Sequence, residues 1–159
     1  MQPTVPPSAV ERIYLPKSIR DAIMVHLLEA APNEGVGLLA VDAAYTDEDG
    51  DLAIDAVRFF PGTNIESSPS RFTMEPAEVV AALGEMRASD LQFGAIVHSH
   101  VRGPATPSAT DLQEAYYPDA LLMIASFAGQ PAVLRAWRIV LEEELQVVQP
   151  VDIVVLDGA

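Results

Sequence analysis

The stretch FGAIVHSHVRGPATPSATD, residues 93–111, runs from an apolar segment through two histidines and a Gly/Pro loop to an acidic helix start. At the end of a strand, residues two apart point the same way, so His98 and His100 can converge on one metal ion. Asp111 falls in the first turn of a helix that Ser108 opens, and it can face back across the loop. Two imidazoles, one carboxylate and a water are typical of an open, catalytic zinc site. The stretch therefore predicts a metal centre.

Each part of this pattern also has a structural explanation. Ser108-x-x-Asp111 is the pattern of a capping box, which begins a helix and has no catalytic role by itself. His-x-His alone is a weak metal motif. The chain has only three histidines, however, and two stand together before the loop and the acidic helix start. This combination favours a metal site. The third, His26, lies on the apolar face of a predicted helix, and we interpret it as a core or rim histidine.

A hydrolytic zinc site also needs a general base for the attacking water. Composition cannot select this base, because the chain contains 23 Asp and Glu residues. Glu34 is a candidate because it stands where a predicted helix ends and an apolar strand begins. The alternative is an ordinary solvated loop glutamate.

Helices and strands mix along the chain without regular βαβ alternation. This indicates an α/β fold of the α+β type, in which helices flank a mixed, largely antiparallel, curved sheet. Hydrophobic periodicity predicts helices over 16–31, 76–89 and from 108 to before Pro118. Strands are predicted over 36–44, 52–60, 93–97, 120–127, 133–140 and, as one or two strands, 144–156.

The length of 159 residues suits one domain with a single hydrophobic core. Residues 1–11 contain three prolines and little that could be buried, so we expect a mobile N-terminal tail. The remaining residues, 12–159, are expected to form the single domain.

Charge and composition exclude several classes of function. The formal net charge of −14 repels phosphate backbones, so no nucleic-acid partner is expected. The absence of cysteine excludes disulfides, thiolate zinc sites and cysteine nucleophiles. The first ten residues show no secretory signal, and the longest apolar run, 120–128, is too short to cross a bilayer. We expect a cytoplasmic protein without a membrane partner.

The sequence resembles the JAMM (MPN-plus) zinc metallopeptidases, in particular their small bacterial branch, over about residues 13–140. The family motif is a distant upstream glutamate, then His-x-His, seven residues, Ser, two residues and Asp. Residues 101–107 supply the seven-residue spacer, and the spacing agrees throughout. The segment PNEGVGLL, residues 32–39, is similar to the family's glutamate segment. Asn64 and RFTMEP, residues 71–76, are similar to the middle region of bacterial members.

Two positions depart from the family pattern. The family commonly has proline directly after the second histidine, where this chain has Val101. Bacterial relatives often have cysteine where Val36 stands. Neither position supplies a metal ligand in the motif, so altered loop shape or substrate contacts are expected rather than inactivity.

The resemblance implies a cytidine-deaminase-like JAMM fold and one Zn²⁺ per chain. It implies hydrolysis of a peptide or isopeptide bond at the C-terminal tail of a ubiquitin-like or sulfur-carrier protein. A zinc-bound water would be the nucleophile, Glu34 the general base, and Ser108 a donor to the developing oxyanion. The oligomeric state stays open.

Other functions stay open as alternatives. The chain could be a non-catalytic protein-binding module that keeps the fold, which absence of metal would favour. Two histidines and one carboxylate could also hold iron in an oxygenase. A DNA-repair-associated relative with a similar motif is a further alternative, against which the net charge argues.

Overall fold

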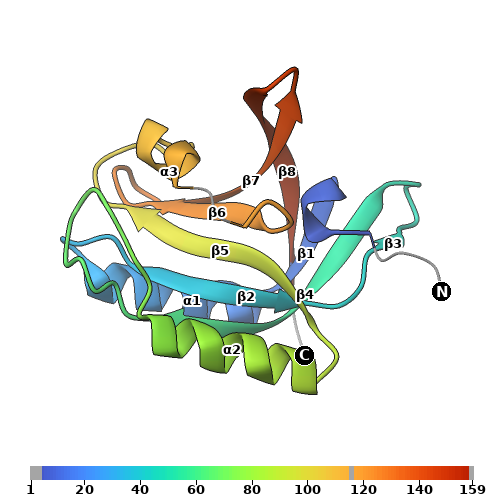
Figure 1. Cartoon of the computed structure of the whole chain (residues 1–159), viewed down its shortest axis with the longest axis horizontal. Helices are drawn as coiled ribbons and strands as arrows, with labels where there is room; N and C mark the ends of the chain where they lie inside the picture. Colours follow the sequence, from blue (N-terminus) through green and yellow to red (C-terminus); the bar gives the residue numbers. More distant parts are fainter. Residues whose placement is uncertain (1–4, 115–116, 158–159) are drawn as a thin grey trace.

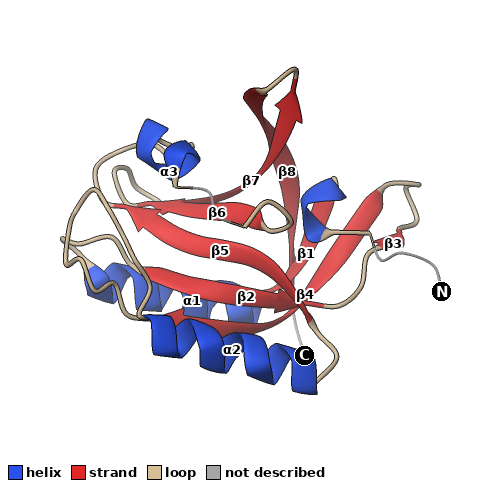
Figure 2. Cartoon of the chain, in the orientation of Figure 1, coloured by secondary structure: helices blue, strands red, loops and turns tan. Residues whose placement is uncertain are grey.

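The computed structural model describes residues 5–114 and 117–157, which form a curved sheet with helices on both of its faces (Figures 1 and 2). The helical elements are η1 (Pro7–Ala9), α1 (Lys17–Ala30), α2 (Pro76–Ala88) and α3 (Ala109–Gln113). The strands are β1 (Arg12–Pro16), β2 (Val36–Val41), β3 (Tyr45–Thr46), β4 (Leu52–Gly62), β5 (Gln92–His100), β6 (Leu121–Ser126), β7 (Val133–Glu142) and β8 (Leu145–Leu156). The predicted α+β class is confirmed.

The order of strands in the sheet is β1-β8-β7-β6-β5-β2-β4-β3, and β1 pairs with β4 as well as with β8. This second pairing bends the sheet round, because β1 bridges two strands that stand far apart in the strand order. The strand β1 is parallel to both partners, and β5 is parallel to β6. The other pairings are antiparallel. The sheet is therefore mixed, largely antiparallel and curved, as predicted.

The strand β2 shows that both faces of the sheet are covered. All of its residues are buried, and its side chains alternate between two cores. Leu39 packs in the core that includes Ile23 and Leu27 of α1. Leu38 packs in the core that includes Met86 of α2. A strand buried on both faces needs a continuous apolar run, and VGLLAV supplies one.

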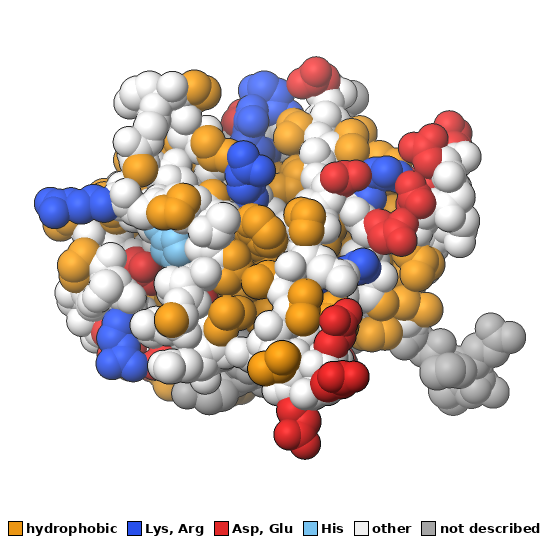
Figure 3. Space-filling view, turned by 90° about the horizontal axis from the view of Figure 1, so that it is seen from above, with side chains coloured by type: hydrophobic (Ala, Val, Ile, Leu, Met, Phe, Trp, Pro, Cys, Tyr) orange, Lys and Arg blue, Asp and Glu red, His pale blue; other side chains and the backbone are white. Residues whose placement is uncertain are grey.

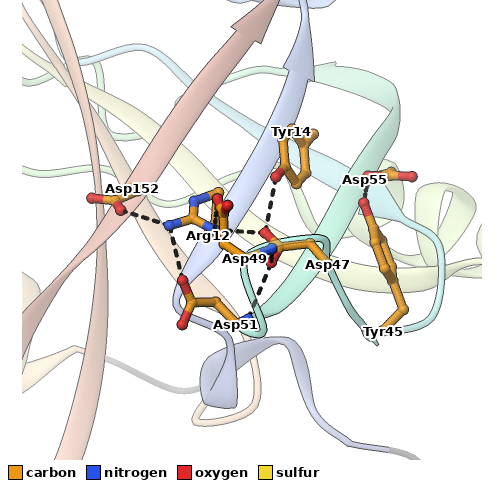
Figure 4. Close-up of polar contacts among 8 residues, drawn as sticks. All are labelled: Arg12, Tyr14, Tyr45, Asp47, Asp49, Asp51, Asp55 and Asp152. Atoms are coloured by element: carbon orange, nitrogen blue, oxygen red, sulfur yellow. Dashed lines mark hydrogen bonds and ion pairs between the residues drawn. The ribbon is translucent and has the colours of Figure 1, made fainter.

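Arg12 joins β1 to the turn before β4 and to β8 (Figure 4). Its guanidinium lies 2.6 Å from Asp47 Oδ2, 3.1 Å from Asp51 Oδ2 and 3.5 Å from Asp152 Oδ2. The Tyr14 hydroxyl donates to Asp47 over 2.9 Å. Burial alone would raise the pKa of Asp47, but hydrogen bonds, the one from Arg12 foremost, lower it to about 2. This network of hydrogen bonds and ion pairs holds β1, the strand whose two pairings curve the sheet, in place.

The N-terminal segment differs from the expected tail. Pro7 and Val10 are buried, and the Ser8 amide donates to the Asp119 carbonyl over 3.0 Å. The expectation that residues 1–11 have little to bury is therefore wrong for 5–11, because Pro7 is buried and Val10 belongs to the core that includes Ile23 and Leu27. Residues 1–4 lie outside the described residues. The assignment of 12–159 to one domain stays a prediction.

Several element bounds also differ from the predicted ones. The strand β1 was not predicted. The strand β5 continues through His100 instead of ending before His98, so both histidines belong to the strand. Residues 115–116 of the predicted third helix lie outside the described residues, and α3 ends at Gln113. Among the helices that the structure describes, none has the length and apolar character needed to cross a membrane.

Candidate metal centre

Three side chains meet at the end of β5. Nε2 of His98 lies 3.3 Å from Nε2 of His100 and 3.2 Å from Oδ1 of Asp111. Nε2 of His100 lies 3.1 Å from Oδ2 of Asp111. All three residues are buried, and their ligand atoms lie within 4.8 Å of one another. The geometry thus brings together the three residues that the sequence pattern singled out as metal ligands.

The spacing of these atoms fits a tetrahedral metal ion. Ligands about 2.0–2.1 Å from zinc at tetrahedral angles stand about 3.3–3.4 Å apart. The two Nε2 atoms are 3.3 Å apart, close to that value, and the separations of 3.2 and 3.1 Å from Asp111 are to its two different oxygens, Oδ1 and Oδ2. The donor set of two imidazoles and one carboxylate is also one that zinc takes in catalytic sites. These residues therefore fit a zinc ion with a fourth position open.

Neighbouring groups orient the two histidine rings. His100 Nδ1 lies 2.8 Å from the Pro104 carbonyl oxygen, to which it can only donate, so in the neutral ring the lone pair is on Nε2, where a metal ion would bind. The His98 ring stacks on Phe72 with centroids 4.6 Å apart, and its Nδ1 has no hydrogen-bond partner among the described residues. Both Nε2 atoms consequently face Asp111.

The protonation of the triad follows from its surroundings. Burial lowers the pKa of His98 below its ordinary value. Burial opposes the charged form of His100 as well, but its hydrogen bond with Asp111 raises its pKa. For Asp111, burial acts to raise the pKa, and the hydrogen bonds with His100 and His98 lower it well below its usual range. An ionised Asp111 among imidazoles is a state suited to a cation.

Glu34 reaches the site because β2 and β5 are neighbours. Val36 stands opposite His98 in the sheet, and the Gly35 amide donates to the Ser99 hydroxyl over 2.8 Å. Ser99 stands between the two histidines, so this buried hydrogen bond places Glu34 beside the triad. The backbone of Glu34 is held on its other side, where its amide donates to the Ser68 carbonyl over 2.8 Å.

The Glu34 side chain is not a solvated loop glutamate. It is 4% exposed, and its Oε1 has no hydrogen-bond partner among the described residues. Burial raises the pKa of Glu34 to about 7, with a smaller lowering by the charge of His100 and a raising by Asp111. A buried, unpaired carboxyl next to candidate metal ligands costs stability, and such groups concentrate at functional sites.

Ser108 caps the helix α3, as its motif suggested, and this capping role is compatible with a second role as a hydrogen-bond donor to the substrate. Its Oγ accepts from the Asp111 amide over 3.0 Å, and the Ser108 amide donates to Asp111 Oδ2 over 2.9 Å. This is a capping box. Because the hydroxyl accepts in the cap, its own proton is free for another acceptor.

Sequence reasoning left some positioning residues without a role. Ser99 had no assigned role, and only its place between two histidines could have indicated one. Asn64 entered only through the resemblance. Its amide donates to the Glu34 carbonyl over 3.0 Å, and its Oδ1 accepts from the Thr73 amide over 3.0 Å. His26 is partly buried and lies 3.0 Å from the carbonyls of Val36 and Gly62, outside the triad, as expected.

Two cavities flank the triad. The first, of about 190 Å³, is mostly apolar and reaches His98 and Asp111. The second, of about 750 Å³, reaches Glu34, His100 and Ser108 and lies along the Gly/Pro loop. Figure 3 shows one histidine side chain that is visible on this face of the molecule, with hydrophobic side chains to one side of it. A substrate can therefore approach the centre from two chemically different sides.

The fold and site define a small α+β domain with a candidate catalytic metal centre. The chain belongs to the family described as prokaryotic homologs of the JAB domain, which matches residues 16–140. This confirms the resemblance stated above.

The named relatives agree with a peptidase class. The chain is 35% identical over 104 residues to the "Probable TtuB-protein conjugate cleaving protease" of Thermus thermophilus, covering 65% of this chain and 63% of that protein. It is 28% identical to a "Desampylase" of Haloferax volcanii, covering 75% of this chain and 84% of the relative. It is 29% identical to the "CysO-cysteine peptidase" of Mycobacterium tuberculosis, covering 81% of this chain and 86% of the relative.

Solved structures show the same fold. A solution structure from Desulfitobacterium hafniense has a TM-score of 0.75 at 29% identity and covers 92% of this chain and 94% of its own. Another, from Salinibacter ruber, has a TM-score of 0.62 at 31% identity and covers 91% of this chain and 92% of its own.

Proposed function

We propose that this chain is a zinc-dependent peptidase that hydrolyses an amide or isopeptide bond at the C-terminal tail of a ubiquitin-like or sulfur-carrier protein. The observation that carries the proposal is the convergence of His98, His100 and Asp111 ligand atoms beside Glu34, whose Oε1 has no hydrogen-bond partner among the described residues. An open three-ligand zinc site next to a free base is the arrangement that metal-assisted hydrolysis needs.

The chain's own residues divide the work of the reaction. When bound, zinc would lower the pKa of a water and polarise the scissile carbonyl. Glu34 takes a proton from the attacking water and delivers it to the leaving amine as the C–N bond breaks. The Ser108 hydroxyl donates to the carbonyl oxygen as negative charge develops there, using the proton that its cap leaves free.

Burial supports Glu34 in this role. A general base works best when its pKa is near the working pH, and in the metal-free protein burial raises the pKa of Glu34 to about 7. A bound cation would lower this pKa, so burial acts against that effect and favours a carboxyl that can accept a proton and return it. A glutamate with an ordinary pKa would hold the proton far less well.

The substrate class rests on the relatives. Their names refer to conjugates of TtuB and to CysO-cysteine. We propose a protein substrate of the same kind for this chain, acting in the cytoplasm and without a nucleic-acid partner. The cavities on both sides of the metal centre are consistent with an extended tail that passes across it.

The test is to incubate zinc-loaded protein with carriers that end in Gly-Gly plus a C-terminal extension and to read the products by mass spectrometry. Cleavage after Gly-Gly by the wild type, and its loss in Glu34→Gln with zinc retained, is the expected result. A wild-type protein that takes up no zinc and binds such carriers without cleaving them would instead favour a non-catalytic binding module.

A further inference from the structure

The two cavities beside the metal centre differ in chemistry and in their contact with the base. The smaller one is lined mainly by apolar side chains, among them Val36, Leu38 and Ile96. Glu34 does not line it. The larger cavity is lined by Glu34 and Ser108 and by polar side chains of the neighbouring loops. The two halves of a substrate must therefore meet different surroundings.

The position of Glu34 indicates which half of the substrate occupies which cavity. A general base that returns its proton to the leaving amine must lie within hydrogen-bond reach of that amine. Glu34 lines only the larger of the two cavities that flank the triad. The leaving amine and what is attached to it consequently occupy the larger cavity, and the acyl side of the scissile bond faces the apolar one.

One arginine, Arg102, lines the larger cavity. It stands two residues after His100, and no hydrogen bond or ion pair of its side chain occurs among residues 5–114 and 117–157. Arg12, Arg58 and Lys17 pair with carboxylates, whereas Arg87 and Arg135, like Arg102, have no such partner among the described residues. What distinguishes Arg102 is its place in the cavity that Glu34 and His100 also line.

Both signs of charge occur around the site. In Figure 3 several Lys and Arg side chains and a smaller number of Asp and Glu side chains lie near the visible histidine, whereas most of the Asp and Glu side chains on this face lie farther from it. A guanidinium presents a planar fork of donors that matches a carboxylate, and such pairs are among the stronger hydrogen bonds in proteins.

We infer that Arg102 binds a free α-carboxylate on the leaving group, so that the preferred substrate is a carrier tail extended by an amino acid with a free C-terminus. This inference rests on the proposed peptidase function. A lysine side chain linked through an isopeptide bond within a folded protein offers no such carboxylate. Arg102 is thus a specificity residue that selects a C-terminal adduct over a protein conjugate.

The affinities of two peptides test carboxylate binding by Arg102 separately from catalysis. Both end in Gly-Gly-Ala, one with a free carboxylate and one with a carboxamide, and their Kd values are measured by calorimetry with zinc-loaded Glu34→Gln protein, which cannot turn them over. A charge-assisted pair predicts that the acid binds about 10- to 100-fold more tightly than the amide. Adding Arg102→Gln should bring this ratio close to one. Arg135→Gln, an exposed arginine on β7, removes the same charge and should leave the ratio unchanged.

The outcomes for the inference and for the function are distinct. The inference is overturned if acid and amide bind equally, if neither binds, or if Arg102→Gln keeps the ratio, since the carboxylate would then bind to the metal or elsewhere. Hydrolysis of the acid peptide by wild-type protein tests the function separately. An Arg102-dependent ratio without any hydrolysis would retain the carboxylate site and reject the peptidase.

Discussion

Replacing Ser108 by alanine removes two interactions of different size. The first is the N-cap of α3, in which Ser108 Oγ accepts from the Asp111 amide over 3.0 Å. Loss of such a cap costs about 0.5–2 kcal/mol of folding free energy, and in a chain of this length each 1 kcal/mol lowers Tm by about 2–4 °C. The second is the proposed hydrogen bond to the oxyanion, whose loss lowers kcat about 10²- to 10³-fold.

Zinc binding should survive this substitution. The bond to Asp111 Oδ2 comes from the backbone amide of Ser108, over 2.9 Å, and alanine keeps that amide. The carboxylate therefore stays oriented toward the histidines. We expect Ser108→Ala to hold one zinc per chain, to melt a few degrees lower and to lose two to three orders of magnitude in kcat.

The assay combines thermal melts, elemental analysis and steady-state kinetics on a Gly-Gly-extended carrier, with Ser108→Thr as the matched control. Threonine keeps the hydroxyl and the cap acceptor, so all three values should stay near the wild type. If Ser108→Ala melted lower but kept kcat within a few-fold of the wild type, Ser108 would be a helix cap alone.

Three further predictions concern the general base Glu34, the side chain of Asn64 that holds its backbone, and the packing of Gly94 in the sheet. In metal-free protein the pKa of Glu34 is about 7 in the folded state, against an ordinary value of 4.5. Between these pH values the native state binds more protons than the unfolded state, so the free energy of unfolding falls as pH rises from 4.5 to 7. Glu34→Gln should reduce this fall in unfolding free energy, measured by chemical denaturation at several pH values, and an unchanged fall would contradict the burial argument. Asn64→Ala should lower kcat by tenfold or more while zinc stays bound, since it releases the Glu34 carbonyl; loss of zinc instead would mean a collapse of the site. Gly94→Ala should cost about 1–3 kcal/mol of stability because its Cβ would overlap the Val41 side chain, and a Tm equal to that of wild type would show that β2 and β5 can separate.

The metal ligands could be predicted from sequence because they lie close together in the chain. His98 and His100 share one strand, and Asp111 is brought back by a single loop, so strand and helix periodicity suffice to place them. Glu34 is different, since only the pairing of β2 with β5 brings it to the site. No local pattern encodes that pairing. The position of Glu34 between a predicted helix and a predicted strand made it a candidate, and the resemblance then selected it.

Other features were missed because they depend on packing between distant segments. The strand β1 has only five residues, and its place between β4 and β8 is fixed by partners more than 35 residues away, such as Asp51 for Arg12. Val10 is buried although its neighbours are prolines and polar residues, which is why the segment resembled a free tail. That Arg102 has no ion-pair partner within 5–114 and 117–157 is likewise a property of the folded surface.

X-ray absorption at the zinc edge of zinc-loaded protein tests the central claim most directly. A centre formed by His98, His100 and Asp111 predicts a single shell of about four nitrogen and oxygen ligands at about 2.0–2.1 Å, including the scattering pattern of two imidazoles. Asp111→Asn should weaken or abolish zinc binding. A six-oxygen shell without an imidazole signal, unchanged in Asp111→Asn, would contradict the metal centre and with it the proposed hydrolase.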